Sequence, residues 1–299
     1  MSETTQRKLE NPASKYPAPP FERQPQQAPG LVSKMNPLPD HGEQSYRGSG
    51  RLQGRKALIT GGDSGIGRAV AIAYAREGAD VAINYLPEEQ ADADEVIALI
   101  EAAGQKGYAI PGDITESSFC QTLVKEAVEK LGGLDILVSN AGRQQAVDSI
   151  LDITEDGFDA TIKTNIYAPF WITKAALPHL PEGSAIIATS SVQAYDPSEN
   201  LFDYAQTKAA NVAYVKSLAK QLGSKGIRVN GVAPGPVWTP LQVSGGQPQD
   251  AIEKFGSVTP LGRPGQPAEL ASIYVQLADA DASYATGQVY GAAGGNGHP

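Results

Sequence analysis

From residue 56 onward, short apolar segments alternate with longer segments that have the spacing of helices. The first apolar segment, residues 57–60, is followed by a glycine-rich turn and an alanine-rich stretch. The alternation predicts further strands at 81–84, 107–110, 134–138, 184–190, 227–232 and 287–291, and helices at 88–103, 118–131, 157–180 and 204–222. Strands that are apolar along their whole length are typical of a parallel sheet with both faces covered. The chain is therefore predicted to be an α/β protein with a doubly wound parallel sheet of about seven strands.

Residues 1–50 differ in composition from this domain. Eight of the 22 prolines lie before Asp40, among Gln, Ser, Lys and Glu residues. Such a segment buries too little apolar surface to fold alone, and proline favours extended backbone. We therefore expect a proline-rich N-terminal arm, partly disordered, at residues 1–50 and a folded domain at residues 51–299. Seven side chains are candidate anchors for the arm: Tyr16, Pro20, Phe21, Leu31, Val32, Met35 and Leu38.

The composition argues against several classes of function. A net charge of −9 is unfavourable for a nucleic-acid-binding surface. The single Cys120 permits no internal disulfide, and the three histidines are scattered, so no metal site is predicted. The N-terminus lacks the apolar core of a signal peptide, and no apolar run approaches the ~18 residues of a membrane span. A cytoplasmic protein without a membrane partner is expected.

The glycine-rich turn is the strongest local indication of a ligand. Gly61, Gly65 and Gly67 stand between the first predicted strand and the first predicted helix. Such a turn needs backbone conformations that side chains forbid, and a helix that begins there points free N–H groups at phosphates. A tight turn without a ligand would use the same residues. The position at the first strand–helix junction favours a dinucleotide site, as in Rossmann-type domains.

A tyrosine and a lysine lie four residues apart in the predicted 204–222 helix. Tyr204 and Lys208 would share one helix face, where a nearby ammonium favours phenolate and lets the phenol exchange protons nearer neutral pH. Ser190 and Ser191 end an apolar strand, which predicts hydroxyls at its carboxyl end. The pair alone is weak evidence, because a solvated lysine beside a half-buried tyrosine has the same spacing.

Six short motifs follow one another along the chain: Thr60-Gly-x-x-x-Gly-x-Gly67, Asn140-Ala-Gly142, Asn165, Ser191, Tyr204-x-x-x-Lys208 and Pro234-Gly235. In order and spacing they resemble the short-chain dehydrogenase/reductase family, over about residues 52–297. The proline-rich arm and the Thr-Gly-Gly-Asp-Ser-Gly-Ile-Gly loop resemble its bacterial glucose/ribitol-dehydrogenase-like branch, also described as general stress oxidoreductases.

The resemblance implies a dinucleotide-binding catalytic domain with four catalytic residues. Tyr204 would be the general acid for carbonyl reduction and the base for alcohol oxidation, and Lys208 would lower its pKa and hydrogen-bond the nicotinamide ribose. Ser191 would steady the substrate oxygen, while Ser190 would be structural. Asn165 would help to hold a water chain leading to the lysine. Hydride would pass directly between the nicotinamide and the carbonyl carbon, without a metal.

The resemblance also implies a set of cofactor-binding residues, in which Asp113 would contact the adenine unless it only caps the next helix. The set is Gly61, Asp63, Ser64, Gly65, Ile66, Gly67, Asn84, Tyr85, Asp113, Ile114, Asn140, Ala141, Gly142, Tyr204, Lys208, Pro234, Gly235, Val237 and Thr239. NAD and NADP both stay open, because residues 84–86 carry no acid for a ribose hydroxyl and Ser64 is not a base for a 2′-phosphate. We expect dual use.

Substrate-binding side chains are expected at Ser191, Gln193, Tyr195 and Trp238. With Gln144 and Leu241 they offer amides and apolar surface, and Arg143 is the only cation near them in sequence. This favours a small aldehyde or ketone, or an alcohol of the polyol type. The resemblance implies a lid over the substrate that runs from Trp238 to about Leu261, and a plain surface loop would suit the same residues. The alternatives are a sugar 1-dehydrogenase, a β-ketoacyl reductase, or a non-catalytic protein that senses the cofactor.

Family members commonly form tetramers, so a homotetramer is expected. Two predicted helices, 157–180 and 204–222, carry apolar residues beyond those that one sheet contact needs. These residues are Ile166, Phe170, Trp171, Val212, Val215 and Leu218.

Overall fold

The computed structural model describes residues 9–296 and contains one parallel sheet. Its strands are β1 (Lys56–Thr60), β2 (Asp80–Tyr85), β3 (Gly107–Pro111), β4 (Ile136–Ser139), β5 (Ala185–Thr189), β6 (Arg228–Pro234) and β7 (Val289–Ala292). They lie in the order β3-β2-β1-β4-β5-β6-β7, and every neighbouring pair is parallel. The strand order reverses between β1 and β4, so the predicted doubly wound Rossmann-type sheet is confirmed.

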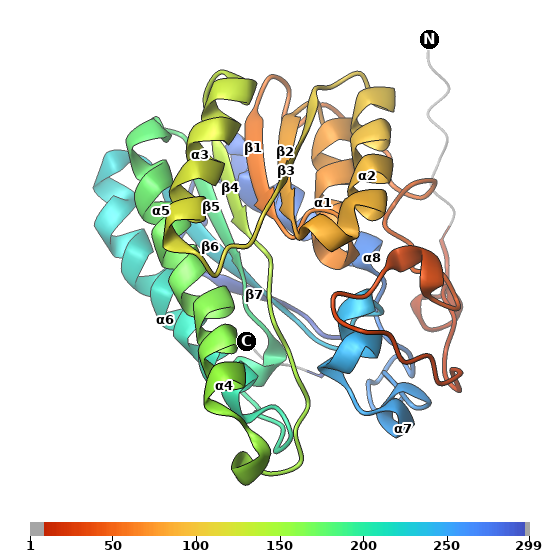
Figure 1. Cartoon of the computed structure of the whole chain (residues 1–299). Helices are drawn as coiled ribbons and strands as arrows, with labels where there is room; N and C mark the ends of the chain where they lie inside the picture. The colour runs from red at the N-terminus through yellow and green to blue at the C-terminus, as the bar shows by residue number, and fades with distance from the viewer. Residues whose placement is uncertain (1–8, 297–299) are drawn as a thin grey trace.

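Helices cover both faces of the sheet (Figure 1). One face packs against α1 (Gly65–Arg76), α2 (Gln90–Ala102) and α8 (Pro267–Ala278) through a shared apolar core. The other packs against α3 (Ser117–Leu131), α5 (Ala168–Ala176) and α6 (Phe202–Leu222). The strands are buried between these two cores, which explains why their sequences are apolar without alternation.

Two short helices lie outside these layers. Helix α4 (Glu155–Ile162) precedes α5 and is joined to it by the π-helical turn η5 (Lys163–Tyr167). Helix α7 (Gln249–Ile252) lies in the segment between β6 and α8. No helix in residues 9–296 combines the length and the apolar character that crossing a membrane requires.

Helix α8 was not predicted, although its start carries two signals. Pro267 occupies its first turn, where a missing N–H costs nothing. The Glu269 carboxylate turns back and accepts a hydrogen bond of 2.8 Å from the backbone N–H of Gln266. The loop character of the preceding residues obscured this cap, because glycine and proline recur from residue 245 to 267.

The N-terminal arm lies on its own domain, beside α7 and along the side of the molecule that carries α1, α2 and α8 (Figure 1). Of the expected anchors, Phe21, Val32 and Met35 are buried, whereas Leu38 is 64% exposed. Two guanidinium groups also hold the arm. Arg76 donates to the carbonyls of Gly42 and Glu43, and Arg263 donates to the Pro12 carbonyl. Partial disorder was expected within residues 1–50; residues 9–50 are described here, and residues 1–8 lie outside the described residues.

Candidate active site

A cleft of about 1220 Å³ lies at the carboxyl ends of the parallel strands. Its walls come from the loops that follow β1 to β6, from the segment before α8, and from the arm at residues 28–30. Carboxyl ends of strands at a reversal of strand order are where open α/β sheets bind ligands. Every predicted cofactor-binding residue except Gly67 lines this cleft.

The loop after β1 holds the backbone against the cleft. Gly65 has a φ of +49°, a left-handed conformation that favours glycine. A Cβ on Gly67 would lie 1.8 Å from the Gly61 carbonyl oxygen, so no side chain fits there and Gly67 supports the loop from below. Ser64, the residue before α1, makes no side-chain capping bond to the helix. The first N–H groups of α1 therefore remain available to an anion such as a diphosphate.

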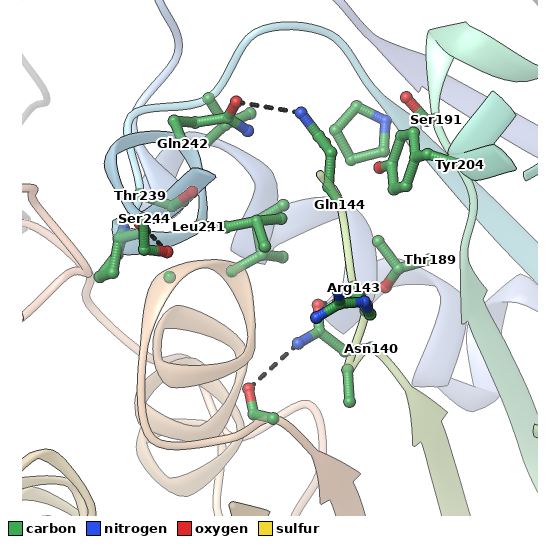
Figure 2. Close-up of a pocket in the computed structure, with 18 of the residues that line it drawn as sticks. Asn140, Arg143, Gln144, Thr189, Ser191, Tyr204, Thr239, Leu241, Gln242 and Ser244 are labelled. Carbon is green, nitrogen blue, oxygen red and sulfur yellow. Dashed lines mark hydrogen bonds between the residues drawn. The ribbon is translucent and has the colours of Figure 1, made fainter. Parts of the chain in front are cut away.

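The end of β4 is tied to the same loop. The Thr60 hydroxyl accepts hydrogen bonds from the N–H groups of Asn140 and Ala141, at 3.1 and 3.2 Å. In return, the Asn140 side chain donates to the carbonyls of Thr60 and Gly61, as one dashed line in Figure 2 shows. These bonds fix the width of the cleft at the point where the strand order reverses.

Tyr204 and Ser191 lie side by side at the cleft (Figure 2). Tyr204 is in the first turn of α6, and Ser191 follows β5. Burial raises the pKa of Tyr204 to about 12, and a hydrogen bond from Ser191 opposes this shift. The phenol therefore keeps its proton at neutral pH.

Lys208 lies one helical turn further along α6, and its ammonium is buried. Its Nζ donates to the Thr189 carbonyl at 2.8 Å and lies 5.3 Å from the centroid of the Tyr204 ring. Burial lowers the pKa of Lys208 to about 8. The expected lowering of the pKa of Tyr204 by Lys208 does not appear in these side chains, because loss of hydration on burial dominates the shift.

Asn165 occupies the π-helical turn η5 rather than a regular helix position. Its Nδ2 donates to the Arg143 carbonyl and to the Thr207 hydroxyl, at 2.9 and 3.0 Å, and its Oδ1 accepts from the Arg143 N–H at 2.8 Å. A Cβ on Gly142 would lie 3.5 Å from the Lys208 ammonium and 3.6 Å from the Asn165 Oδ1. The glycine thus keeps space between the lysine and the asparagine. Single-turn π-bulges often occur at functional sites, but residue spacing in the sequence did not reveal this one.

Some of the predicted substrate-binding side chains line the cleft and others do not. Ser191 and Gln193 line the cleft, as do Gln144 and Leu241. Gln144 reaches across to the lid and donates to the Gly246 carbonyl at 2.6 Å (Figure 2 shows its longer contact with Gln242). Tyr195 is not among the cleft-lining residues.

The prediction that Trp238 contacts the substrate is wrong. Its side chain is fully buried, stacks on Phe21 of the arm at 4.3 Å between ring centroids, and donates from Nε1 to the Pro37 carbonyl. Val237 and Thr239 on either side of it do line the cleft. Successive side chains of an extended segment point in opposite directions, so Trp238 faces the arm.

Two parts of the cleft wall were missed. Glu89 lines it from the short helix η3 (Pro87–Glu89), and Ala28, Pro29 and Gly30 line it from the arm. Glu89 falls in the predicted 88–103 helix, to which no site residue was assigned, and nothing in the composition of the arm points to a cleft. Asp113 lines the cleft, and its carboxylate accepts a hydrogen bond from the Thr115 N–H. It does not cap α3, whose N-cap residue is Glu116, and its contact with the adenine stays a prediction.

Comparison with known proteins identifies the family. Residues 61–296 match a family model described as enoyl-(acyl carrier protein) reductase. The chain is also 37% identical to a short chain dehydrogenase from Burkholderia cenocepacia, solved in complex with NADP, with a TM-score of 0.76 over 82% of this chain and 98% of that one. The chain belongs to the short-chain dehydrogenase/reductase family. It is accordingly an NAD(P)-dependent oxidoreductase.

Relatives of similar length match nearly the whole chain, and some of them are named for a substrate. The chain is 59% identical to the uncharacterized oxidoreductase YhxD of Bacillus subtilis, over 96% of this chain and 97% of that protein. It is 44% identical to an NADPH-dependent aldehyde reductase of Arabidopsis thaliana (92% and 97%) and 43% identical to a glucose and ribitol dehydrogenase of Daucus carota (89% and 93%). A 3-ketoacyl-(acyl-carrier-protein) reductase from Brucella melitensis, solved with NADH, is 30% identical, with a TM-score of 0.74 over 82% and 98% of the chains.

Proposed function

We propose that this family member interconverts a small aldehyde or ketone with its alcohol, and that Tyr204 exchanges the proton with the substrate oxygen. The observation that carries the proposal is the pairing of the Tyr204 and Ser191 hydroxyls at the cleft, with the Lys208 ammonium beneath the tyrosine ring. Two hydroxyls that converge on one point can bind a carbonyl oxygen and stabilise the charge that develops on it.

Proton transfer follows from the state of these groups. Because burial raises the pKa of Tyr204, the phenol is a hydrogen-bond donor toward a carbonyl and supplies a proton as the oxygen becomes an alkoxide. The Ser191 hydroxyl holds the oxygen beside it. Lys208 and Asn165 lie behind the tyrosine. We propose that they hold a chain of water molecules that returns a proton to Tyr204.

The residues present fit a nicotinamide dinucleotide. The uncapped N-terminus of α1 and the close-packed glycine loop accommodate a diphosphate. Gly142 and Lys208 would flank the nicotinamide ribose, and Pro234, Gly235, Val237 and Thr239 would border the nicotinamide. When bound, the nicotinamide supplies or accepts the hydride.

A small polar carbonyl compound fits the substrate end of the cleft. Gln144 and Gln193 provide amides, Leu241 provides apolar surface, and Gln144 is already bonded to the lid. The aldehyde reductase of Arabidopsis thaliana supports an aldehyde, and the glucose and ribitol dehydrogenase of Daucus carota supports a polyol-type alcohol.

We also propose a homotetramer built on α4, α5 and α6. Phe170 is 54% exposed, and Ile166, Trp171, Val212 and Leu218 are half-buried, which leaves apolar surface for a partner. Val215 does not belong to this surface, because it is fully buried in the core beneath α6. Light scattering that gives a monomer mass would contradict this assembly.

The decisive experiment replaces Tyr204 by Phe. We expect turnover of aldehydes to fall by about 1000-fold while the Kd of the reduced cofactor changes little, because only the proton donor is removed. Tyr214→Phe is the matched control: Tyr214 is also on α6, but its hydroxyl bonds to Thr173, and it does not line the cleft. Retained turnover in Tyr204→Phe would remove Tyr204 from the reaction. A wild-type protein that binds cofactor but turns over no aldehyde, ketone or alcohol would instead favour the cofactor-sensing alternative.

A further inference from the structure

Two carboxyl groups meet in the cleft wall beside the ends of β1 and β2. Asp63, in the loop after β1, is 1% exposed, lines the cleft, and has an Oδ2 atom without a hydrogen-bond partner among the described residues. Glu89 reaches the same wall from η3, where its Oε2 accepts a hydrogen bond of 3.1 Å from the Leu86 N–H. The two carboxyl groups are hydrogen-bonded to each other.

No cation neutralises this pair within residues 9–296, because no salt bridge there involves Asp63 or Glu89. Arg68 is the arginine of the adjoining network, and its Nη2 lies 3.1 and 3.0 Å from the carboxylates of Glu43 and Glu95. The neighbouring Asp92 adds negative charge and accepts a hydrogen bond from the Val32 N–H.

The side chains that act directly on the pair are neutral or negative. The Ser64 hydroxyl bonds to Asp63, and the Tyr85 hydroxyl donates to Gln90. His41, whose pKa burial lowers, and Arg68 act on Asp92 rather than directly on the pair. The electrostatic potential of this part of the wall is therefore set by carboxyl groups.

This position determines how the adenosine half of a dinucleotide is recognised. In doubly wound domains, an acidic side chain near the end of the second strand bonds to the ribose 2′-hydroxyl of NAD, whereas a basic one accommodates the 2′-phosphate of NADP. Residues 84–86, which end β2, offer neither. The Asp63–Glu89 pair brings carboxylate oxygens to the same wall from the glycine loop and from η3.

We propose that the Asp63–Glu89 carboxyl pair makes the protein select NAD(H) over NADP(H). A carboxylate oxygen accepts a hydrogen bond from a ribose hydroxyl, but repels a phosphate with nearly two negative charges. A relative named as NADPH-dependent shows that use of NADPH is compatible with the family, so a preference for NAD(H) in this chain would have to come from its own side chains.

The selection is expected to depend on pH. Burial is the main cause that raises the pKa of Asp63 to about 6 and that of Glu89 to about 8, and their mutual interaction adds to the shift of Glu89. The pair gains protons as the pH falls through this range, and its repulsion of a 2′-phosphate weakens. The phosphate itself also loses charge near pH ~6, so a variant is needed to separate the two effects.

The test measures the Kd of NADH and of NADPH from nicotinamide fluorescence, which requires no turnover. We expect wild type to bind NADH at least about tenfold more tightly than NADPH at pH 8. Glu89→Gln should reduce this ratio at least about fivefold and lose most of its change between pH 8.5 and 5.5. Glu88→Gln is the matched control, because Glu88 is exposed and does not line the cleft.

Two results would overturn the inference: equal or tighter binding of NADPH by wild type at pH 8, or the same change of ratio in Glu88→Gln. If Glu89→Gln binds neither cofactor, the thermal unfolding temperature of the cofactor-free protein provides a second measurement. A raised pKa in the folded state destabilises it as the pH rises, so Glu89→Gln should unfold at a higher temperature than wild type at pH 8, with no gain at pH 4 to 5. No gain at pH 8 would contradict the charged pair. The inference rests on cofactor binding in the proposed function, and a failure of substrate turnover would leave the Kd ratio measurable.

Discussion

Replacing Phe21 by Ala should release the front of the N-terminal arm from the lid. The Phe21 ring stacks on Trp238, and the Phe21 N–H donates to the Glu253 carbonyl at 3.1 Å. Burying a phenylalanine contributes about 1.5–3 kcal/mol, and an aromatic pair adds about 0.5–1.5 kcal/mol. Val32 is buried outside the cluster that Phe21 forms with Met35 and Trp238, and it holds a later part of the arm, so the loss should act locally. A local loss of about 3 kcal/mol raises the population of the released state roughly 100-fold.

Two observables report this release. In a Trp171→Phe background, Trp238 is the only tryptophan, and its emission should shift to longer wavelength as water reaches the ring. Hydrogen exchange at the backbone N–H groups of Gln24 and Gln26 should accelerate by up to about 100-fold. These N–H groups donate to the Gln249 side chain and to the Val243 carbonyl in the segment between β6 and α8. The midpoint of global unfolding should fall less than a core substitution would cause.

Leu38→Ala provides the control, because this side chain is 64% exposed and should change stability by less than about 0.5 kcal/mol. Unchanged Trp238 emission and unchanged exchange at Gln24 and Gln26 in Phe21→Ala would refute the role of Phe21 as an anchor. Loss of global stability with full protection of these amides would show that the arm is part of the cooperative core.

Three further outcomes are expected. Ser191→Ala should lower kcat by about 100-fold with little change in cofactor Kd, measured by steady-state turnover and fluorescence titration, because it removes one of two oxyanion-binding hydroxyls. Gly67→Ala should abolish cofactor binding or folding, since its Cβ would meet the Gly61 carbonyl, whereas Gly223→Ala, with no atom within 4 Å, should melt like wild type. Burial opposes ionisation of Glu43, but His41 and Arg68 lower its pKa to about 2. Its stabilising effect is present above its ordinary pKa of 4.5 and is lost as the pH falls toward 2, so the Tm difference between wild type and Glu43→Gln should vanish over that range.

The sheet was predictable because burial on both faces leaves a direct record in the sequence. The uninterrupted apolar residues of β1, β4 and β5 can only be accommodated between two helical layers. The glycine loop was predictable for a similar reason, because any side chain at position 67 would clash with the Gly61 carbonyl oxygen. Backbone constraints of this kind depend on local sequence, and the glycine loop that they predict borders the cleft.

The walls of the cleft depend on contacts between segments that are distant in the sequence. No local sequence pattern indicates such contacts. Trp238 lies between two cleft residues, and only the presence of Phe21 on its other side explains where its ring points. Glu89 is close in sequence to a predicted strand end, but its approach to Asp63 depends on the short helix η3 and its bond to Leu86. Spacing alone therefore could not place Trp238 and Glu89, because their positions depend on contacts with distant segments or on a local turn.

The Tyr204–Lys208 pair shows the same limit in its chemistry. Helical spacing predicts that the two groups are close, and it suggests that the ammonium stabilises phenolate. Both groups are buried, however, so the charged form of each loses hydration, and the pKa of Tyr204 rises while that of Lys208 falls. Depth in the fold therefore decides the sign of the shift. A phenol held in its protonated form can donate a proton, so under the proposed function these side chains favour reduction of a carbonyl. Oxidation of an alcohol requires further positive charge in the cleft, because such charge stabilises the phenolate form of Tyr204 that accepts the alcohol proton.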